Sequence, residues 1–199
     1  MTMRVLIAGI LGGIAMYIWS TIAHVALPLG QVGFSQMPDE AAVLSAAQAS
    51  NGAKDGLYIF PWIDPKDPQM MQKMNAAMKT NPSGLLLYHA PGHGVTDMAA
   101  PMLAEFLKEV LQALIAAFLV SLAAVSTYWG RVGFVTLVGG VAAITTNVSY
   151  WIWYGFPGDY SLAAVFIELV DYIAAGLAIA WWLGRKSSRT AGAVATAAT

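Results

Sequence analysis

The sequence contains no cysteine. Disulfide bonds, thiolate metal sites, iron–sulfur clusters and cysteine nucleophiles are therefore excluded. Charged residues are also scarce, at 11% of the 199 residues, whereas a typical soluble domain carries about 25%. The formal net charge is −1, so the chain lacks the basic surface of a nucleic-acid-binding protein. Composition thus argues against a soluble globular protein and against nucleic acid as a partner.

Long apolar runs are abundant, in keeping with a hydrophobic fraction of 58%. A transmembrane helix needs about 20 mostly apolar residues, and four stretches reach this length: 5–26, 106–128, 132–154 and 162–184. The first run is longer than the apolar part of a secretory signal and lacks a small-x-small cleavage pattern, which favours an uncleaved anchor. The sequence predicts an all-α integral membrane protein whose four transmembrane helices form a bundle.

Orientation follows from the basic residues near the helix ends, because lysine and arginine concentrate on the cytoplasmic side. Arg4, Arg131, Arg185, Lys186 and Arg189 share one side if both termini are cytoplasmic. All 11 acidic residues then lie in the outer segments or in the outer half of the bundle. We expect a multi-pass protein of the bacterial cytoplasmic (inner) membrane, with membrane lipids around it and residues 27–102 in the periplasm.

Four regions follow from this topology: a first transmembrane helix (1–26), an extracytoplasmic cap (27–102), transmembrane helices two to four (103–186) and a flexible cytoplasmic tail (187–199). Within the cap, the pattern predicts helices over 38–49 and from an Asp67-Pro68 start to about residue 79. Two apolar runs flanked by glycine and proline, 57–62 and 85–89, predict strands. We expect a small α+β cap that rests on the bundle.

Each predicted span carries one face of small or polar residues at helical spacing, which is how membrane helices pack against one another. The four faces comprise Gly9, Gly13, Met16, Ser20 and His24; Glu105, Glu109, Gln112 and Ala116; Gly140, Ala143, Asn147 and Tyr150; and Ala164, Glu168, Asp171, Ala175 and Ala178. These faces predict a closely packed bundle. Gly9 and Gly13 form a GxxxG pair, a candidate for a tight helix crossing.

Polar residues on these faces lie at a similar depth in the membrane. With a rise of about 1.5 Å per residue, Glu168 lies roughly 9 Å and Asp171 roughly 14 Å below the outer end of the fourth span. The candidate intramembrane pocket comprises His24, Lys108, Gln112, Asn147, Glu168 and Asp171. Lys108 lies at its rim with two glutamates. The sequence predicts a polar pocket in the outer half that opens towards the cap.

Two interpretations of the buried acids remain open. An acid at this depth costs about 2.5 to 3.5 kcal/mol unless it is protonated or paired. In the functional interpretation, Glu168 and Asp171 bind a cation, a proton or the polar head of a lipid or quinone. In the structural interpretation, one acid is protonated or Lys108 pairs with both, while His24 and Asn147 hydrogen-bond across helices.

A metal site has only weak candidates. His89, His93 and Asp97 have the spacing of helical ligands, but Pro91 and Gly92 forbid a helix between them. An ordinary surface loop is the simpler interpretation.

Cofactor and catalytic motifs are largely missing. Bis-histidine haem needs two axial ligands and the spans contain one histidine, so a single haem or pigment on His24 is the alternative left open. No GxSxG, Walker-type or HExxH signature occurs, and we predict no catalytic activity. Met70, Met71, Met74 and Met78 recur at helical spacing in the cap, which predicts either an adaptable contact surface or a helix face buried on the bundle.

Several segments resemble a group of bacterial four-helix hypothetical membrane proteins. The segments are LPLG at 27–30, GLYIFP at 56–61, PSGLLLYH at 82–89 and YWxWYGFP at 150–157. The resemblance covers most of the chain except the tail. It implies the four-helix membrane fold, and the group has no assigned activity that could be carried over.

These observations favour a non-catalytic accessory or structural subunit that packs against a larger membrane complex, respiratory or photosynthetic, through other integral membrane subunits. The alternative is a small transporter, or a membrane protein that binds a lipid or quinone through the outer-half acids. The sequence leaves open whether a lipid, quinone or pigment is bound.

Overall fold

The computed structural model describes residues 2–50, 54–92 and 98–185. The chain is mostly helical, with one two-stranded sheet. Three helical stretches are long and apolar enough to cross a membrane: Met3–Ala26, Tyr128–Tyr154 and Gly158–Gly184. These three helices are consistent with a multi-pass membrane protein, as the apolar runs predict.

The first and second long helices are α1 (Met3–Thr21), which continues as the π-helical segment η1 (Ile22–Ala26), and α4 (Ala99–Leu122). The second predicted span, 106–128, runs too far at its C-terminal end, because α4 stops at Leu122. Ala124 adopts a positive φ of 52°, which stops the helix although the sequence stays apolar. The hydroxyl of Thr127 then accepts a hydrogen bond from the Gly130 amide at 3.1 Å and caps the next helix.

The third long helical stretch is a continuous rod made of α5 (Tyr128–Ala143), the π-helical segment η3 (Ile144–Val148) and α6 (Ser149–Tyr154). It ends at Gly155, whose φ of 67° lies in the left-handed region that favours glycine. Pro157 follows, and α7 (Gly158–Gly184) returns beside the rod.

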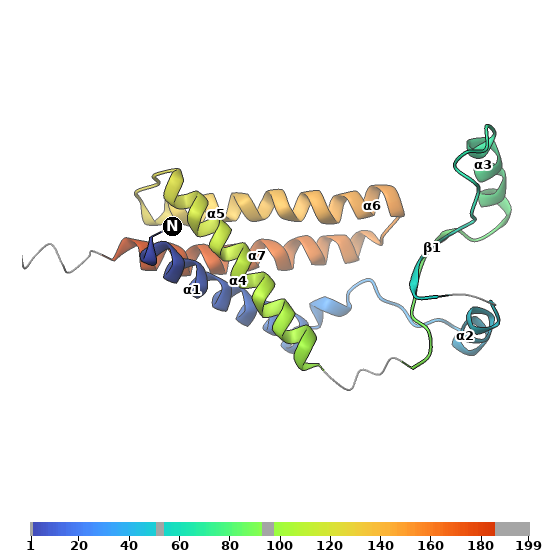
Figure 1. The fold of residues 1–199 in the computed structure, drawn as a ribbon, viewed down its shortest axis with the longest axis horizontal. Coiled ribbons are helices and arrows are strands. Elements are labelled where there is room, and N and C mark those ends of the chain that lie inside the picture. The colour runs from blue at the N-terminus through green and yellow to red at the C-terminus, as the bar shows by residue number, and fades with distance from the viewer. Residues whose placement is uncertain (1, 51–53, 93–97, 186–199) are drawn as a thin grey trace, which may run out of the picture.

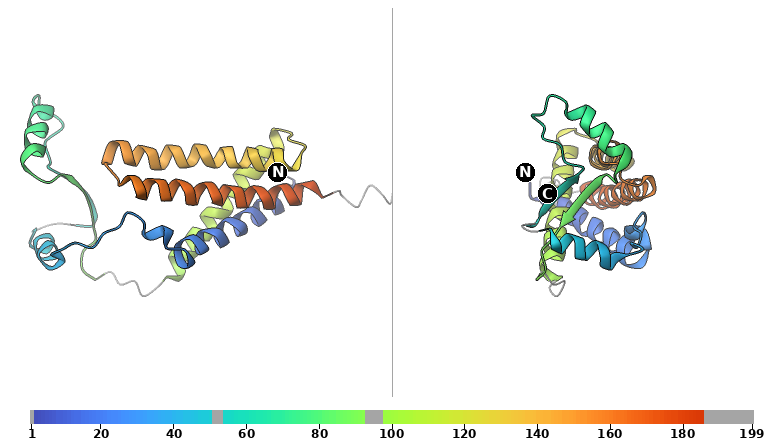
Figure 2. Two further views of the ribbon diagram at one scale, coloured as in Figure 1. Left: turned by 180° about the vertical axis from the view of Figure 1, so that it is seen from behind. Right: turned by 90° about the vertical axis from the view of Figure 1, so that its right-hand side faces the viewer.

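The four long helices form a row in the order α4, α1, α7, α5. Helix α1 packs along both α4 and α7, and α5 packs along the far side of α7. In contrast, α4 makes only sparse contacts with α5. Figures 1 and 2 show α4 crossing its neighbours obliquely and diverging from α5 towards its own N-terminus. The row therefore does not close into the tightly packed bundle that the sequence predicts.

Small residues make the close contacts in this row. A Cβ atom on Gly13 would lie 2.5 Å from Val110 Cα, and one on Gly9 would lie 2.7 Å from Leu114 Cα. The GxxxG pair thus does mark a tight crossing, between α1 and α4. On α5 the close contact is made by Gly139, which faces the ring of Tyr172. Gly140 of the predicted stripe is therefore not the contact residue, whereas Ala143 of the same stripe is buried.

Three arginines gather at one end of the row. Arg4 donates hydrogen bonds to the carbonyl oxygens of Leu183, at 2.9 Å, and of Arg185. Arg131 donates to the Val125 carbonyl at 2.8 Å, and the Arg185 guanidinium lies 3.9 Å from the centre of the Trp181 ring. Lys186, Arg189 and the predicted tail lie outside the described residues.

The segment between α1 and α4 contains η2 (Pro28–Gln31), α2 (Glu40–Ala49), β1 (Gly56–Phe60), α3 (Met70–Thr80) and β2 (Gly84–Tyr88). The two strands pair antiparallel, with Tyr58 opposite Leu86. Both predicted helices and both predicted strands are present. Helix α3 begins at Met70, because Asp67 and Pro68 form the turn before it: the Asp67 carboxylate accepts from the Gln69 amide at 2.8 Å.

This segment extends beyond the ends of α6 and α7 (Figure 1). A small cavity brings Met74 and Met78 of α3 near Trp153 and Tyr154 at the end of α6. Large apolar side chains on the two-stranded sheet and on α3 nonetheless stay exposed, among them Leu57 and Leu87 at 66% each and Met71 at 72%. The methionine face is thus only partly covered.

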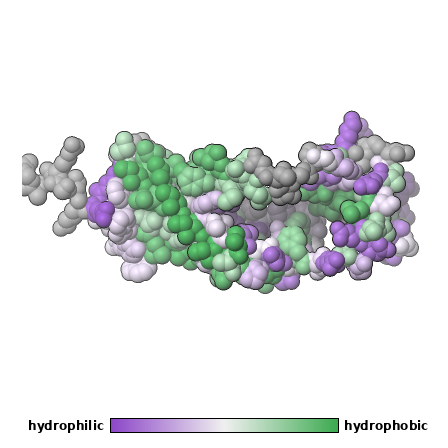
Figure 3. Space-filling model, turned by 90° about the horizontal axis from the view of Figure 1, so that it is seen from below, coloured by the Kyte–Doolittle hydropathy of each residue, from purple (hydrophilic) through white to green (hydrophobic). Residues whose placement is uncertain are grey.

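The surface changes character along the molecule. Figure 3 shows an apolar band over the long helices, with hydrophilic residues towards both ends. The apolar band is the surface expected to contact lipid.

Candidate functional site

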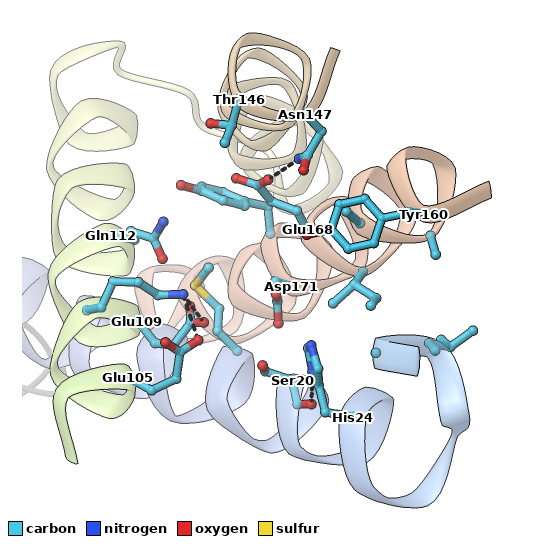
Figure 4. A pocket seen from close by; sticks show the side chains of 18 of the residues that line it. Ser20, His24, Glu105, Glu109, Gln112, Thr146, Asn147, Tyr160, Glu168 and Asp171 are labelled. Atoms are coloured by element: carbon cyan, nitrogen blue, oxygen red, sulfur yellow. Dashed lines mark hydrogen bonds and ion pairs between the residues drawn. The ribbon is translucent and has the colours of Figure 1, made fainter. Parts of the chain in front are cut away.

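A cavity of about 460 Å³ lies between α1, α4, η3 and α7. Figure 4 shows side chains from all these elements pointing into it. The structure brings together around this cavity all six residues of the candidate pocket: His24, Lys108, Gln112, Asn147, Glu168 and Asp171. Among the described residues of 35–98, none lines it, so its outer wall is formed by η2 and Phe34 and not by the sheet.

Helix α4 contributes an ion-pair cluster. The Lys108 ammonium lies 2.7 Å from a Glu105 oxygen and 3.0 Å from Glu109 Oε1. The Lys108 side chain is half exposed, whereas the Glu109 side chain is only 2% exposed. The expected pairing of Lys108 with the two acids of α7 was wrong, because the two glutamates of its own helix lie closer. Glu109 belongs to the pocket interior, although the sequence placed it at the rim.

Helix α7 contributes the two acids that the sequence singles out. Asn147 donates a hydrogen bond to Glu168 at 3.1 Å, and its amide also donates to the Ala143 carbonyl at 3.1 Å. This is a polar contact between helices of the expected kind. Asp171 is 7% exposed, and its Oδ1 has no hydrogen-bond partner among the described residues.

His24 comes from the end of the first span. Its Nδ1 lies 2.8 Å from the Ser20 carbonyl oxygen, and because a carbonyl only accepts, Nδ1 carries the hydrogen. The expected bond from His24 to another helix is not formed. Instead the ring packs on Gly30, where any Cβ atom would collide with it. The LPLG turn therefore folds back over His24.

Both His24 and Asn147 lie in π-helical segments, η1 and η3. A π-helical turn inserts one residue into an α-helix and is frequent at functional sites. These two turns change which residues face the cavity from α1 and from the α5 rod. Hydrophobic periodicity does not reveal a single inserted residue, so these two turns could not be predicted from the sequence.

Aromatic rings form one side of the cavity. Phe34 and Tyr160 both line it and meet edge to face, with ring centres 5.6 Å apart. Phe156 packs against Tyr160 at 5.4 Å and stacks on Tyr150 at 5.4 Å. Neither Phe34 nor Tyr160 is among the candidate pocket residues predicted from the sequence. Gly155 and Pro157 of the YWxWYGFP segment were the one available hint, because they mark the turn that leads into α7, which carries Tyr160.

The candidate metal ligands are not assembled in the described chain. His89 Nδ1 lies 3.9 Å from an Asp55 oxygen, while His93 and Asp97 lie outside the described residues. Within the described ranges, no group of three His, Cys, Asp or Glu residues could hold a metal ion.

The cavity combines hydrogen-bonding groups with apolar walls. Carboxylates, an ammonium and an amide lie beside Met16, Leu29 and Ile167. Such a lining suits a molecule that has one polar and one apolar part. Comparisons with known protein families, curated proteins and solved structures found no match.

Proposed function

We propose that α4 is a fourth membrane span. Its 24 residues extend about 36 Å, more than the roughly 30 Å of a bilayer core. Its outward face carries exposed large apolar residues at helical spacing, namely Leu103, Leu107, Leu111, Ile115, Phe118 and Leu122. Glu105, Lys108 and Glu109 turn instead towards the cavity or its rim.

The arginine end is then cytoplasmic, and the segment between α1 and α4 lies outside the membrane, in the periplasm of a bacterial cell. Arg4, Arg131 and Arg185 support this orientation through the positive-inside rule. The likeness of the LPLG and YWxWYGFP motifs to the bacterial four-helix group supports the same topology.

Within this topology, the protein binds the polar head of a membrane amphiphile, of the lipid or quinone class, without catalysis. The observation that carries this function is the cavity of about 460 Å³, whose lining combines buried carboxylates with apolar side chains. Helix α4 makes only sparse contacts with α5, so we place the tail of the bound molecule between these two helices, directed towards lipid.

The test is to identify what the protein carries from its own membrane. The protein is purified in mild detergent, and bound small molecules are identified by native mass spectrometry. We expect one amphiphile at a stoichiometry near one per chain. The variant Ala164→Trp, which fills the cavity from α7, should lose it.

The matched control is Ala104→Trp, which adds the same side chain at an exposed position of α4 that does not line the cavity. It should retain the bound molecule. Lipid that is bound equally by wild type and by both variants would contradict the proposal.

A second candidate function is an accessory subunit of a larger membrane complex. It is favoured by exposed apolar residues in and beside the two-stranded sheet. Leu57, Trp62 and Leu87 are 66 to 67% exposed although they lie outside the apolar band. Large apolar residues that stay exposed outside a membrane often mark a protein interface. Purification from native membranes should then recover stoichiometric integral membrane partners, and a lone monomer or homo-oligomer would exclude this function.

A further inference from the structure

Two carboxylate oxygens in the cavity have no hydrogen-bond partner in the described chain: Glu109 Oε2 and Asp171 Oδ1. Both residues are more than nine-tenths buried, with exposures of 1% and 7%. Figure 4 shows Asp171 pointing into the space between α7 and α1, across from the Glu109 cluster. A buried carboxylate without a donor is costly, so each oxygen requires a donor, which either a proton on the acid or the head group of a bound molecule can supply.

The cavity cannot supply these donors from its own charged groups. Four carboxylates border it, from Glu105, Glu109, Glu168 and Asp171, whereas Lys108 is the single lysine or arginine among the described lining residues. Lys108 is already engaged by the two glutamates of α4.

Two further polar side chains of the lining, those of Asn147 and His24, donate elsewhere. The Asn147 amide donates to Glu168 and to a backbone carbonyl. His24 donates from Nδ1 to the backbone of its own helix. Among the described lining residues, the cavity therefore has more carboxylates than cationic groups.

We propose that the ligand is a lipophilic ammonium ion, whose N–H groups donate to Glu109 Oε2 and Asp171 Oδ1. This assignment rests on the amphiphile-binding function proposed above and specifies the chemistry of its head group. An ammonium group offers several donors and a positive charge at one atom, which is what the two orphaned oxygens lack. Charge-assisted hydrogen bonds of this kind are the strongest available to a carboxylate.

Two further features of the cavity favour an organic cation over a metal ion as its ligand. No described group of three ligating residues could hold a metal, and a cavity of about 460 Å³ is far larger than a bare ion. Phe34 and Tyr160 place aromatic rings in the lining, and aromatic faces attract organic cations.

The experiment compares three probes with the same alkyl chain in nanodiscs of zwitterionic lipid: dodecylammonium, dodecanol and dodecyl sulfate. Binding to the full-length wild-type protein is measured by native mass spectrometry and by competition with a fluorescent alkylammonium. We expect dodecylammonium to bind roughly tenfold or more tightly than dodecanol, and dodecyl sulfate to bind weakest.

Isosteric variants test whether Glu109 and Asp171 are the residues that bind the ammonium group. Asp171→Asn and Glu109→Gln each remove a negative charge without changing side-chain size, and each should reduce dodecylammonium affinity by roughly tenfold while leaving dodecanol unchanged. The control Asp159→Asn, in the first turn of α7 and outside the described lining, should bind like the wild type.

The outcomes separate this inference from the function on which it rests. If dodecanol and dodecylammonium bind equally and Ala164→Trp abolishes both, the cavity binds amphiphiles and the ammonium assignment is wrong. If neither probe responds to Ala164→Trp, the proposed function itself fails. Preference for dodecyl sulfate would also overturn the assignment. The wild-type comparison of the three probes needs no variant to fold.

Discussion

At the scale of single residues, Asp67 shows how one side chain prepares a helix start. Its carboxylate accepts from the Gln69 amide at 2.8 Å and lies 2.5 Å from the Lys73 ammonium. The hydrogen bond from Lys73, followed by that from Gln69, lowers the pKa of Asp67 below its ordinary value. Both interactions require the charged carboxylate.

The sign of the pH dependence follows from this lowered pKa. The contribution to stability is present above the pKa of the unfolded chain and is lost as the pH falls through the lower pKa of the folded state. NMR titration of the Asp67 carboxyl should give a midpoint below that of a model peptide. Lys73→Ala should raise this midpoint, whereas Lys79→Ala should not. An unchanged midpoint in Lys73→Ala would contradict the ion pair.

Asn147 is the residue that links the α5 rod to the acid of α7. Asn147→Ala removes the donor that reaches Glu168 across the helix interface and should destabilise the fold by about 1–3 kcal/mol, because a part-buried carboxylate loses its partner. The measurement is thermal unfolding in detergent. Thr145→Ala, which removes an exposed bond within one helix, serves as control and should have a small effect. Equal losses would argue that the Asn147 contact adds nothing.

At the scale of helices, the α1–α4 crossing depends on glycine. Gly13→Ala would place a Cβ 2.5 Å from the Val110 backbone, so the two helices must separate, at a cost of about 1–3 kcal/mol or more. Gly133→Ala, on the open face of α5, meets nothing within 4 Å and should stabilise by up to about 1 kcal/mol. Unfolding temperatures in detergent should therefore shift in opposite directions. A shift of the same sign in both variants would contradict this packing.

Elements with a strong local signal could be predicted from the sequence, and elements that depend on one residue could not. The apolar runs indicated the long helices, and the glycine and proline flanks indicated both strands. The stop at Ala124 was missed because a left-handed alanine has no signature in an apolar run. The π-helical turns around His24 and Asn147 were missed because each changes the register by one residue only.

The six candidate pocket residues illustrate the same division. Their helical spacing and shared depth could be read from the sequence, and they do surround one cavity. The interaction partners of these residues could not be predicted from the sequence, because Lys108 can reach acids on its own helix or on α7 from the same backbone position. Tertiary packing decides between these alternatives, and it favours Glu105 and Glu109.

At the scale of the whole molecule, topology is the first property to test. The chain has no cysteine, so a single introduced cysteine reports one position. Ser83→Cys lies before β2 and Ser126→Cys lies at the arginine end, and both positions are exposed. A membrane-impermeant maleimide should label Ser83→Cys on intact bacterial spheroplasts but Ser126→Cys only after permeabilisation. The reverse pattern would invert the proposed orientation.

The open row of helices links the topology to the proposed function. Helix α4 packs on α1 and makes only sparse contacts with α5. In the proposed function, the cavity holds the polar head and the apolar tail lies between α4 and α5. A bundle closed by α4 packing against α5 would leave no place for such a tail.

The most direct test of the amphiphile site is a high-resolution density map of the protein in nanodiscs made from its own membrane lipids. We expect density for a head group between Glu109 and Asp171, with a tail that leaves between α4 and α5. A cavity that contains only water, or that is closed by α4 packing against α5, would contradict the account.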